Sequence, residues 1–421
     1  MNAYSFLENV FYPNLGLYVV ALLISQLFFL PFYLKRVRSI IDPMLKNLIF
    51  VGLANAVPVL LFLTNNVSWE IFSFFLCAQI LFWTIFYINS SRLYPIKQKK
   101  KIPYRNFDDF FFKLCFALYL ITTLYSYALN GIPLLNDSRF EQTIDNSSGI
   151  LGLLSRLSSS VSTMVNIYII YLIKHKRYQK GVIPLIVVLI FGLLGGSKGF
   201  ILNIAYSIFF YFLYYENYIP KIKKTYLLIG ILTPITTIII SGVSSDINGA
   251  FGFYMYRLLA NGDMYWNAYP DDVINSLQVD RDGIANMTYF LWGPFRHIFG
   301  IEVNEEKMMT TIGADIFEMS SGFYPDSGAP NSPFTLVLWV YYRWWGLIGV
   351  ALLAWLGSTI TYFAQNKMSN TLPDTCFKAL LFYCGIGMFG DIYLFFNGFF
   401  GLFLFYFIYK TLHFTFVRLS K

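Results

Sequence analysis

Charged residues are scarce in this sequence. Only 13% of its 421 residues are Asp, Glu, Lys or Arg, whereas a soluble globular domain has about 25%. Hydrophobic residues make up 57% of the chain and aromatic residues 20%. This composition excludes an ordinary cytosolic enzyme, a disordered protein and a secreted disulfide-rich scaffold. It indicates a membrane protein with several spans.

Cysteine and histidine are also rare. The four cysteines lie inside apolar runs, which argues against disulfides and thiolate metal sites, because both usually need paired cysteines in structured loops. The three histidines form no HExxH-type pair. We therefore expect neither a metal nor a cofactor.

Apolar runs dominate what remains of the sequence. A bilayer core needs about 17–25 apolar residues per helix, and we expect 11 such helices and no strands. Runs six and seven meet at the glycine-rich stretch 195–199, so we expect a hairpin there rather than one long helix. The predicted spans are 15–34, 45–63, 69–89, 110–129, 150–173, 182–196, 199–215, 225–243, 334–363, 376–391 and 392–412.

The spans divide the chain into three parts. Residues 1–243 hold spans one to eight, 244–333 form one large loop, and 334–421 hold spans nine to eleven. The loop is neither repetitive nor poor in aromatic residues, so we expect it to be ordered and partly helical. Helices are predicted over 251–260, from Pro270, and over 305–317, followed by an irregular entry into span nine at 322–333.

The positions of Lys and Arg predict the orientation. Four basic clusters fall on the same side of an 11-span bundle, at 35–38, 97–101, 174–177 and 221–224. Cytoplasmic loops carry an excess of Lys and Arg, so this side is predicted to be cytoplasmic. The N-terminus and the large loop then lie outside and the C-terminus inside. The net charge of +8 is thereby explained as topology signals facing anionic lipid, and we expect no nucleic-acid partner.

Eight basic residues remain away from the predicted cytoplasmic side. A charge at membrane depth costs at least about 2.5 kcal/mol, which makes such a residue a candidate for function. Arg156 in span five, Lys198 at the glycine-rich tip and Arg343 near span nine are in this position. The alternative is that each reaches the headgroups or pairs with an acid such as Asp391, which equally well caps the turn between the last two spans. The remaining five are Arg139, Arg257, Arg281, Arg296 and Lys307.

The large loop adds Arg257, Arg296 and His297 as candidates. The loop carries four basic and twelve acidic residues. The alternative for each arginine is therefore a structural ion pair with a neighbouring carboxylate instead of substrate binding. His297 is a candidate general base because of its residue type, but a lone loop histidine is usually only solvated or hydrogen-bonded. Cations at one face of a membrane bundle suit an anionic headgroup on a lipid tail, because arginine binds phosphate bidentately and lysine supplies a point charge.

Short motifs give these cations a family context. Gly-Ser-Lys-Gly at 196–199 resembles the Gly-Ser-Arg/Lys-Gly element of Wzy-type O-antigen polymerases, also called oligosaccharide repeat-unit polymerases. Arg257 with Asp263 resembles their Arg-x-x-x-x-Gly-Asp segment. The stretches 329–331 and 344–349 resemble their Gly-Pro-Asn and Phe-Gly-x-x-Gly block. Lys198 stands where many members have Arg, and Ala329 stands where Gly is common.

This resemblance implies a helical fold akin to the lipid-sugar-using (GT-C-like) membrane glycosyltransferases and O-antigen ligases. It implies that a polysaccharide on undecaprenyl diphosphate is transferred to a lipid-linked repeat unit at the periplasmic face of the bacterial inner membrane. A chain-length regulator and a flippase are the implied partners. The implied diphosphate-binding residues are Lys198, Arg257 and Arg343, supported by Arg156 and Arg296, while Asp263 or His297 takes the acceptor proton, and further support comes from Arg139, Asn331 and Asp391.

Two other functions compete with the polymerase. An O-antigen ligase shares the fold and donor but uses a lipid A-core acceptor. A flippase for lipid-linked oligosaccharides belongs to another class, usually with twelve or more spans, internal duplication and short loops. The absence of a sequence repeat and the long loop favour the polymerase.

Overall fold

The computed structural model describes residues 1–90, 102, 104, 106–134, 149–195, 200–219, 247–296, 300–324 and 331–419. Every secondary-structure element assigned in this part of the chain is a helix, as the composition predicts. Six helices are long and apolar enough to cross a membrane, and three shorter apolar helices accompany them within the same ranges. The predicted eighth span, 225–243, lies outside the described residues.

The first half of the chain forms long helices at the predicted positions. Their bounds follow the apolar runs, because a helix satisfies every backbone group internally and is therefore favoured where water is absent. The short opening elements are α1 (Ala3–Phe6), η1 (Leu7–Phe11) and η2 (Tyr12–Asn14). The helices that follow are α2 (Leu15–Leu34), α3 (Pro43–Leu63), α4 (Trp69–Ser90), α5 (Asn106–Asn130), α7 (Gly149–Lys174), α8 (Tyr178–Leu194) and α9 (Phe200–Phe210), which continues as η4 (Tyr211–Glu216).

Many large apolar side chains on the described helices are exposed. Leu27, Phe32, Ile183, Phe403 and Phe407 each have more than 60% of their surface uncovered. Contiguous exposed apolar surface is uncommon on soluble monomers but is what a helix facing lipid presents. The exposed apolar surface and the long apolar helices together indicate a membrane-spanning protein.

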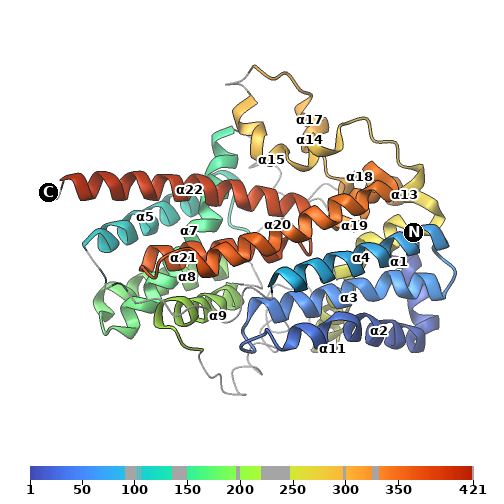
Figure 1. Cartoon of the computed structure of the whole chain (residues 1–421), viewed down its shortest axis with the longest axis horizontal. Coiled ribbons are helices and arrows are strands. Elements are labelled where there is room, and N and C mark those ends of the chain that lie inside the picture. The colour runs from blue at the N-terminus through green and yellow to red at the C-terminus, as the bar shows by residue number, and fades with distance from the viewer. Residues whose placement is uncertain are drawn as a thin grey trace.

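The helices form two packed groups joined near the middle of the molecule (Figure 1). In one group α2 packs on α3, and α4 packs on α20 (Gly346–Asn366). In the other, α7 is central and contacts α5, α8, α9 and α22 (Ile392–Leu419). The groups meet where α21 (Leu372–Gly387) packs against α20 and α22. The N- and C-termini lie at opposite ends of the long axis.

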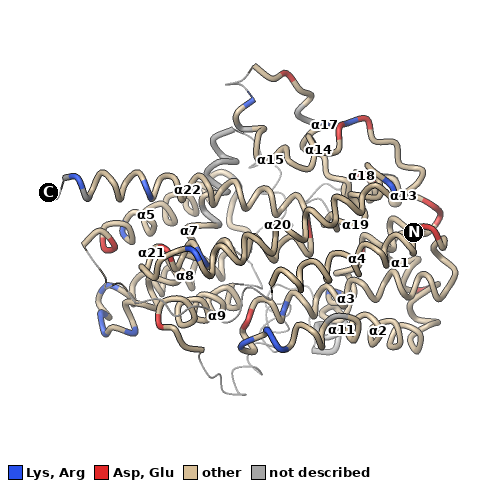
Figure 2. The backbone as a smooth tube through the Cα atoms, viewed as in Figure 1, with Lys and Arg blue, Asp and Glu red and all other residues tan. Residues whose placement is uncertain are grey.

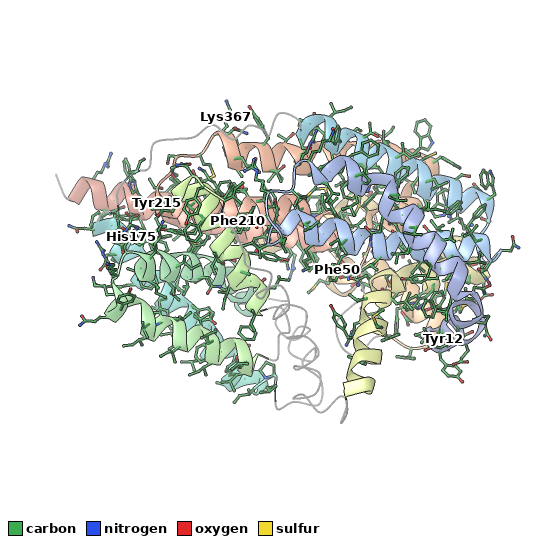
Figure 3. All side chains as sticks on the ribbon, turned by 90° about the horizontal axis from the view of Figure 1, so that it is seen from below. Tyr12, Phe50, His175, Phe210, Tyr215 and Lys367 are labelled. Atoms are coloured by element: carbon green, nitrogen blue, oxygen red, sulfur yellow. The ribbon has the colours of Figure 1, made fainter. Side chains whose placement is uncertain are left out.

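Charges gather at helix ends and in connections, whereas most of the helical tube carries none (Figure 2). Side chains fill the space between helices, with Phe210 and Tyr215 among them, while His175 and Lys367 lie near the edge (Figure 3). This distribution is what a low-dielectric surrounding favours, because burying an unpaired charge is costly.

The predicted break between runs six and seven is present. Helix α8 ends at Leu194 and α9 begins at Phe200 as a separate helix. A methyl group at Gly192 would lie 2.6 Å from Cδ2 of Phe200, so glycine permits this close approach. The tip at 196–199 lies outside the described residues.

Span nine differs from the prediction of one continuous helix over 334–363. The chain forms α19 (Phe334–Tyr342), then the turn η8 (Arg343–Trp345), then α20. The break occurs because Arg343 adopts φ 50° and ψ −135°, outside the helical region. Gly346 makes the tight turn possible, since a Cβ there would lie 2.6 Å from the carbonyl oxygen of Leu338.

The predicted large loop contains a series of short helices. The predicted helix at 305–317 is divided at residues 310–311, and the helix predicted over 251–260 begins at Ile247. The predicted helix start at Pro270 is instead a short turn, because Asp271 and Asp272 adopt left-handed backbone angles with φ of 58° and 54°. These elements pack onto both helix groups, with α12 on α3, α13 on α19 and α15 on α22. They are α11 (Ile247–Leu259), η5 (Ala260–Gly262), α12 (Asp263–Ala268), η6 (Pro270–Asp272), α13 (Val273–Ser276), α14 (Gly283–Met287), α15 (Tyr289–Trp292), η7 (Gly293–Phe295), α17 (Glu305–Met309) and α18 (Ile312–Ser321).

Candidate functional site

Four of the predicted site residues cannot be placed in full. Arg139, Lys198 and His297 lie outside the described residues. Arg156 belongs to the first turns of α7, but its side chain lies outside the described part. The site is therefore built from the other candidates, beginning with the Arg-x-x-x-x-x-Asp segment.

Arg257 and Asp263 flank a tight turn that lies on α3. Arg257 is in the last turn of α11, exposed, with its guanidinium carbon 5.1 Å from the ring centre of Phe253. The turn η5 follows, and Asp263 begins α12. A Cβ at Gly262 would lie 2.6 Å from Cγ2 of Val57 and 2.9 Å from a backbone oxygen of α3. The Gly-Asp pair of the motif therefore positions the carboxylate by close backbone packing.

Asp263 is a carboxyl group with a shifted pKa. Burial raises its pKa to about 6, although the N–H of Met264 and the charge of Arg257 lower it in part. Its carboxylate thus predominates at neutral pH and is lost in mildly acidic solution. A general base with a pKa near the working pH is the most effective, so the group has the chemistry for this role.

Arg343 is held at the junction between the loop and the membrane helices. Its Nη1 donates to Oδ1 of Asn275 in α13, and the same oxygen accepts a hydrogen bond of 2.9 Å from Nε1 of Trp339. The guanidinium carbon lies 5.3 Å from the Trp339 ring centre. The side chain is exposed, and its other donors have no partner among the described residues. Arg343 therefore presents a fixed cation with free donors.

Arg296 lies on a different surface from Arg257. It follows η7, and its Nη1 donates to the hydroxyl of Tyr289 at 2.5 Å. Figure 1 shows α11 and α15 on opposite sides of the bundle. The structure thus does not bring these two predicted phosphate ligands together.

Asp391 caps a helix rather than pairing with a cation. Its Oδ1 accepts from the N–H groups of Tyr393 and Leu394 at 2.7 and 3.0 Å, and Oδ2 accepts from Ser332 N–H at 2.8 Å. Within the described ranges no basic side chain forms an ion pair with it. Asp391 thereby ties the start of α22 to the entry of α19, where Asn331 is exposed.

A buried polar network was missed by the sequence reasoning. Arg281 forms an ion pair with Asp315, and its Nε donates to the hydroxyl of Tyr341 at 3.1 Å. Arg281 is one of the basic residues of the predicted loop, but its partners stand 34 and 60 positions away. No local spacing could have shown this pairing.

Asn286 is the centre of the same network. It is fully buried and uses all four hydrogen-bonding positions. Its Oδ1 accepts from Tyr341 and Tyr393 at 2.8 and 2.6 Å, and its Nδ2 donates to the carbonyls of Met308 and Thr310. This side chain connects the loop to α19 and α22, so its role is positional.

No triad of His, Cys, Asp or Glu suited to a metal ion is found in the described part of the chain. Asp280 and Asp282 have Asp-x-Asp spacing, yet their carboxylates bond to different partners. Asp280 pairs with Lys307 at 2.8 Å, and Asp282 caps α14 through the N–H of Ala285. Comparison with protein-family models, curated proteins and solved structures finds no match to this chain.

Proposed function

We propose that the protein is an O-antigen polymerase of the inner membrane. It transfers the growing polysaccharide from undecaprenyl diphosphate to the non-reducing hydroxyl of a lipid-linked repeat unit. In this proposal the segment 247–324 faces the periplasm, and a chain-length regulator and a flippase are the partners. The membrane character and the folded loop support the proposal, as does the resemblance of the short motifs.

The observation that carries the proposal is the presentation of Arg343. A non-glycine residue in such a backbone conformation costs about 1–3 kcal/mol and persists only where the surroundings impose it. Here the strained residue displays an exposed cation with free donors between membrane helices and a folded polar segment. A diphosphate on a lipid has its charge at this boundary, and arginine binds phosphate through paired hydrogen bonds.

The proposed reaction follows from these groups. The acceptor hydroxyl attacks the anomeric carbon, the bond to the diphosphate oxygen breaks, and Arg343 stabilises the negative charge of the leaving group. Asp263 receives the hydroxyl proton, with Arg257 beside it. Helix α12 packs against α13, and α13 packs against α19, so both residues belong to one connected group of elements.

A complementation experiment tests the function and separates it from its rivals. A strain lacking the gene receives the wild-type chain or the Arg343→Ala variant, and its lipopolysaccharide is resolved on a gel. A polymerase restores the ladder, and its absence leaves the core with a single repeat unit. A core with no repeat unit in the deletion strain would instead indicate a ligase or flippase.

A further inference from the structure

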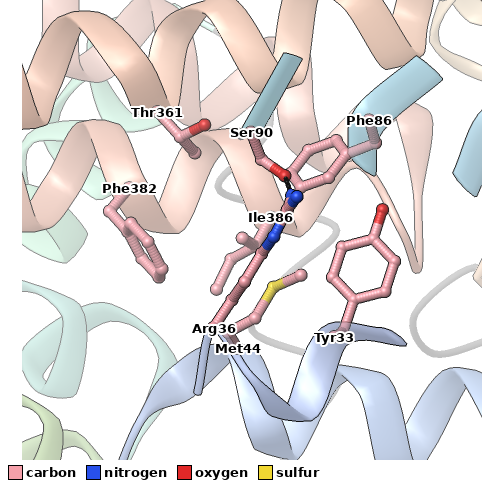
Figure 4. Close-up of a pocket in the computed structure, with 8 residues that line it drawn as sticks. All are labelled: Tyr33, Arg36, Met44, Phe86, Ser90, Thr361, Phe382 and Ile386. Carbon is pink, nitrogen blue, oxygen red and sulfur yellow. Dashed lines mark hydrogen bonds between the residues drawn. The ribbon is translucent and has the colours of Figure 1, made fainter. Parts of the chain in front are cut away.

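A small cavity lies at the C-terminal end of α2. It has a volume of about 20 Å³ and is formed where α2, α3, α4, α20 and α21 meet. Figure 4 shows Arg36 rising from the end of α2 into this space. The remaining lining residues are Tyr33, Met44, Phe86, Ser90, Thr361, Phe382 and Ile386.

Arg36 is fixed in the cavity wall by α4. Its guanidinium carbon lies 3.6 Å from the ring centre of Tyr87. Nη1 donates to the Tyr87 carbonyl at 2.6 Å and to the hydroxyl of Ser90. Nε and Nη2 have no partner among the described residues, and no carboxylate there pairs with this arginine. A half-buried cation with unused donors therefore borders the cavity.

The charges around the cavity favour an anion. Lys35 and Arg38 flank Arg36 in sequence, and Lys35 is exposed. The nearby acid is Asp42, which attracts Arg38, and its two oxygens accept the backbone N–H groups of Arg38 and Met44. Asp42 thus neutralises part of the cluster but does not occupy the donors of Arg36.

The size of the cavity limits the ligand. About 10–15 Å³ is enough for one water molecule, so this cavity admits one oxygen-sized group. A whole sugar or nucleotide is too large, whereas one oxygen of a phosphate fits while the rest of the group stays at the mouth. Basic pockets between membrane helices are known to bind anionic headgroups in this way.

We propose that Arg36 binds the phosphate of an anionic phospholipid, with one oxygen in the cavity and the acyl chains along the exposed apolar helices. The site is separate from the proposed catalytic residues. Its test is therefore lipid binding, and polymer formation is not the readout.

The experiment uses the full chain in a neutral detergent and follows its melting temperature and its bound lipid by native mass spectrometry. Phosphatidylglycerol is titrated against phosphatidylcholine and against inorganic phosphate. We expect phosphatidylglycerol to bind and stabilise, and Arg36→Gln to weaken it at least about tenfold, as loss of a charge-assisted bond predicts. Arg177→Gln is the matched control, because Arg177 is exposed and lies 4.8 Å from the ring of Tyr104.

Unchanged affinity in Arg36→Gln would overturn the proposal, as would equal stabilisation by inorganic phosphate or phosphatidylcholine. If Arg36→Gln does not fold, Arg36→Lys replaces it. That variant keeps the charge but loses the planar donor pair, so phosphatidylglycerol should bind several-fold more weakly. Wild-type affinity in this variant would show that only net charge acts, which also contradicts the assigned geometry.

Discussion

At the scale of single residues, the two best-defined arginines of the candidate site differ in how firmly they are held. Arg343 is fixed by a hydrogen bond to Asn275 and by the ring of Trp339. Arg257 contacts the ring of Phe253 and makes no side-chain hydrogen bond to the described residues. A preorganised cation stabilises developing charge better than a mobile one, because little reorganisation is needed. Arg343 is therefore the residue on which activity should depend most.

Replacing Arg343 by alanine should reduce polymer formation by about 10- to 100-fold, the range expected for one lost charge-assisted contact. The ladder in lipopolysaccharide, scored at equal protein level, measures this. Arg343→Lys should retain part of the activity, because it keeps the charge but not the donor fork.

Lys307 provides the control for Arg343. It is another exposed cation of the segment, but it already pairs with the exposed Asp280. Lys307→Ala should leave the ladder intact. Equal loss in both variants would mean that general loop charge, rather than Arg343, determines activity.

Asp263 should impose an acidic limit on the reaction. Its pKa is raised to about 6, so the carboxylate form is lost as the pH falls through this value. If the carboxylate accepts the proton, activity of the purified protein should fall below about pH 6. The Asp263→Asn variant should have low activity that shows no further fall below about pH 6.

Stability gives a control for the Asp263 variant. Because burial disfavours the ionised form, a raised pKa means that ionisation costs folding free energy as the pH rises towards neutrality. Asp263→Asn should therefore melt no lower than the wild type at pH 7.5. If Asp263→Asn kept the wild-type dependence of activity on pH, Asp263 would not be the proton acceptor.

At the scale of elements, the contact of η5 with α3 fixes the position of the Arg257–Asp263 turn. Gly262→Ala would place a methyl group 2.9 Å from the backbone oxygen of Ala54, which cannot rotate away. We expect a loss of about 1–3 kcal/mol, as for overpacking in a core. Thermal unfolding in detergent measures it.

Gly16→Ala is the matched control for Gly262→Ala. Gly16 lies in the first turn of α2 and has nothing within 4 Å of the position of a Cβ. Alanine there should be neutral or slightly stabilising, because it restricts the unfolded chain. Similar losses at both glycines would contradict the packing explanation.

Element positions could be predicted where the apolar pattern alone decides them. The prediction for α2, 15–34, matches its observed bounds, and α3 and α4 match within two residues. The interruption at Arg343 was missed because apolar residues continue through it, and only the backbone angles reveal the turn. The sequence does not distinguish the two predicted roles of Asp391, because capping and ion pairing both place a carboxylate at this turn.

At the scale of the whole molecule, the loop joins the two helix groups. Its α12 packs on α3 of one group and its α15 on α22 of the other. The network around Asn286 links the same parts through buried hydrogen bonds, and its members are far apart in sequence. This long separation is why the contacts that hold the candidate site together could not be predicted from the sequence.

Asn286→Ala should weaken the attachment of the loop to the helices. It removes four hydrogen bonds, because two tyrosine hydroxyls lose an acceptor and two carbonyls lose a donor, and each buried group left unsatisfied costs about 1–3 kcal/mol. We expect a clear drop in melting temperature and increased proteolysis within 247–324. Asn261→Ala is the control, because the Asn261 side chain bonds, among the described residues, only to the carbonyls of Arg257 and Leu258 in the adjoining helix α11. Equal effects would contradict the bridging role.

The most direct test of the central claim is the lipopolysaccharide profile of a deletion strain carrying no plasmid, the wild-type gene or the gene for Arg343→Ala. We expect core with a single repeat unit in the deletion strain, a full ladder with the wild type, and a strongly reduced ladder with the variant. A deletion strain that still makes the ladder, or one that shows core with no repeat unit, would contradict this claim.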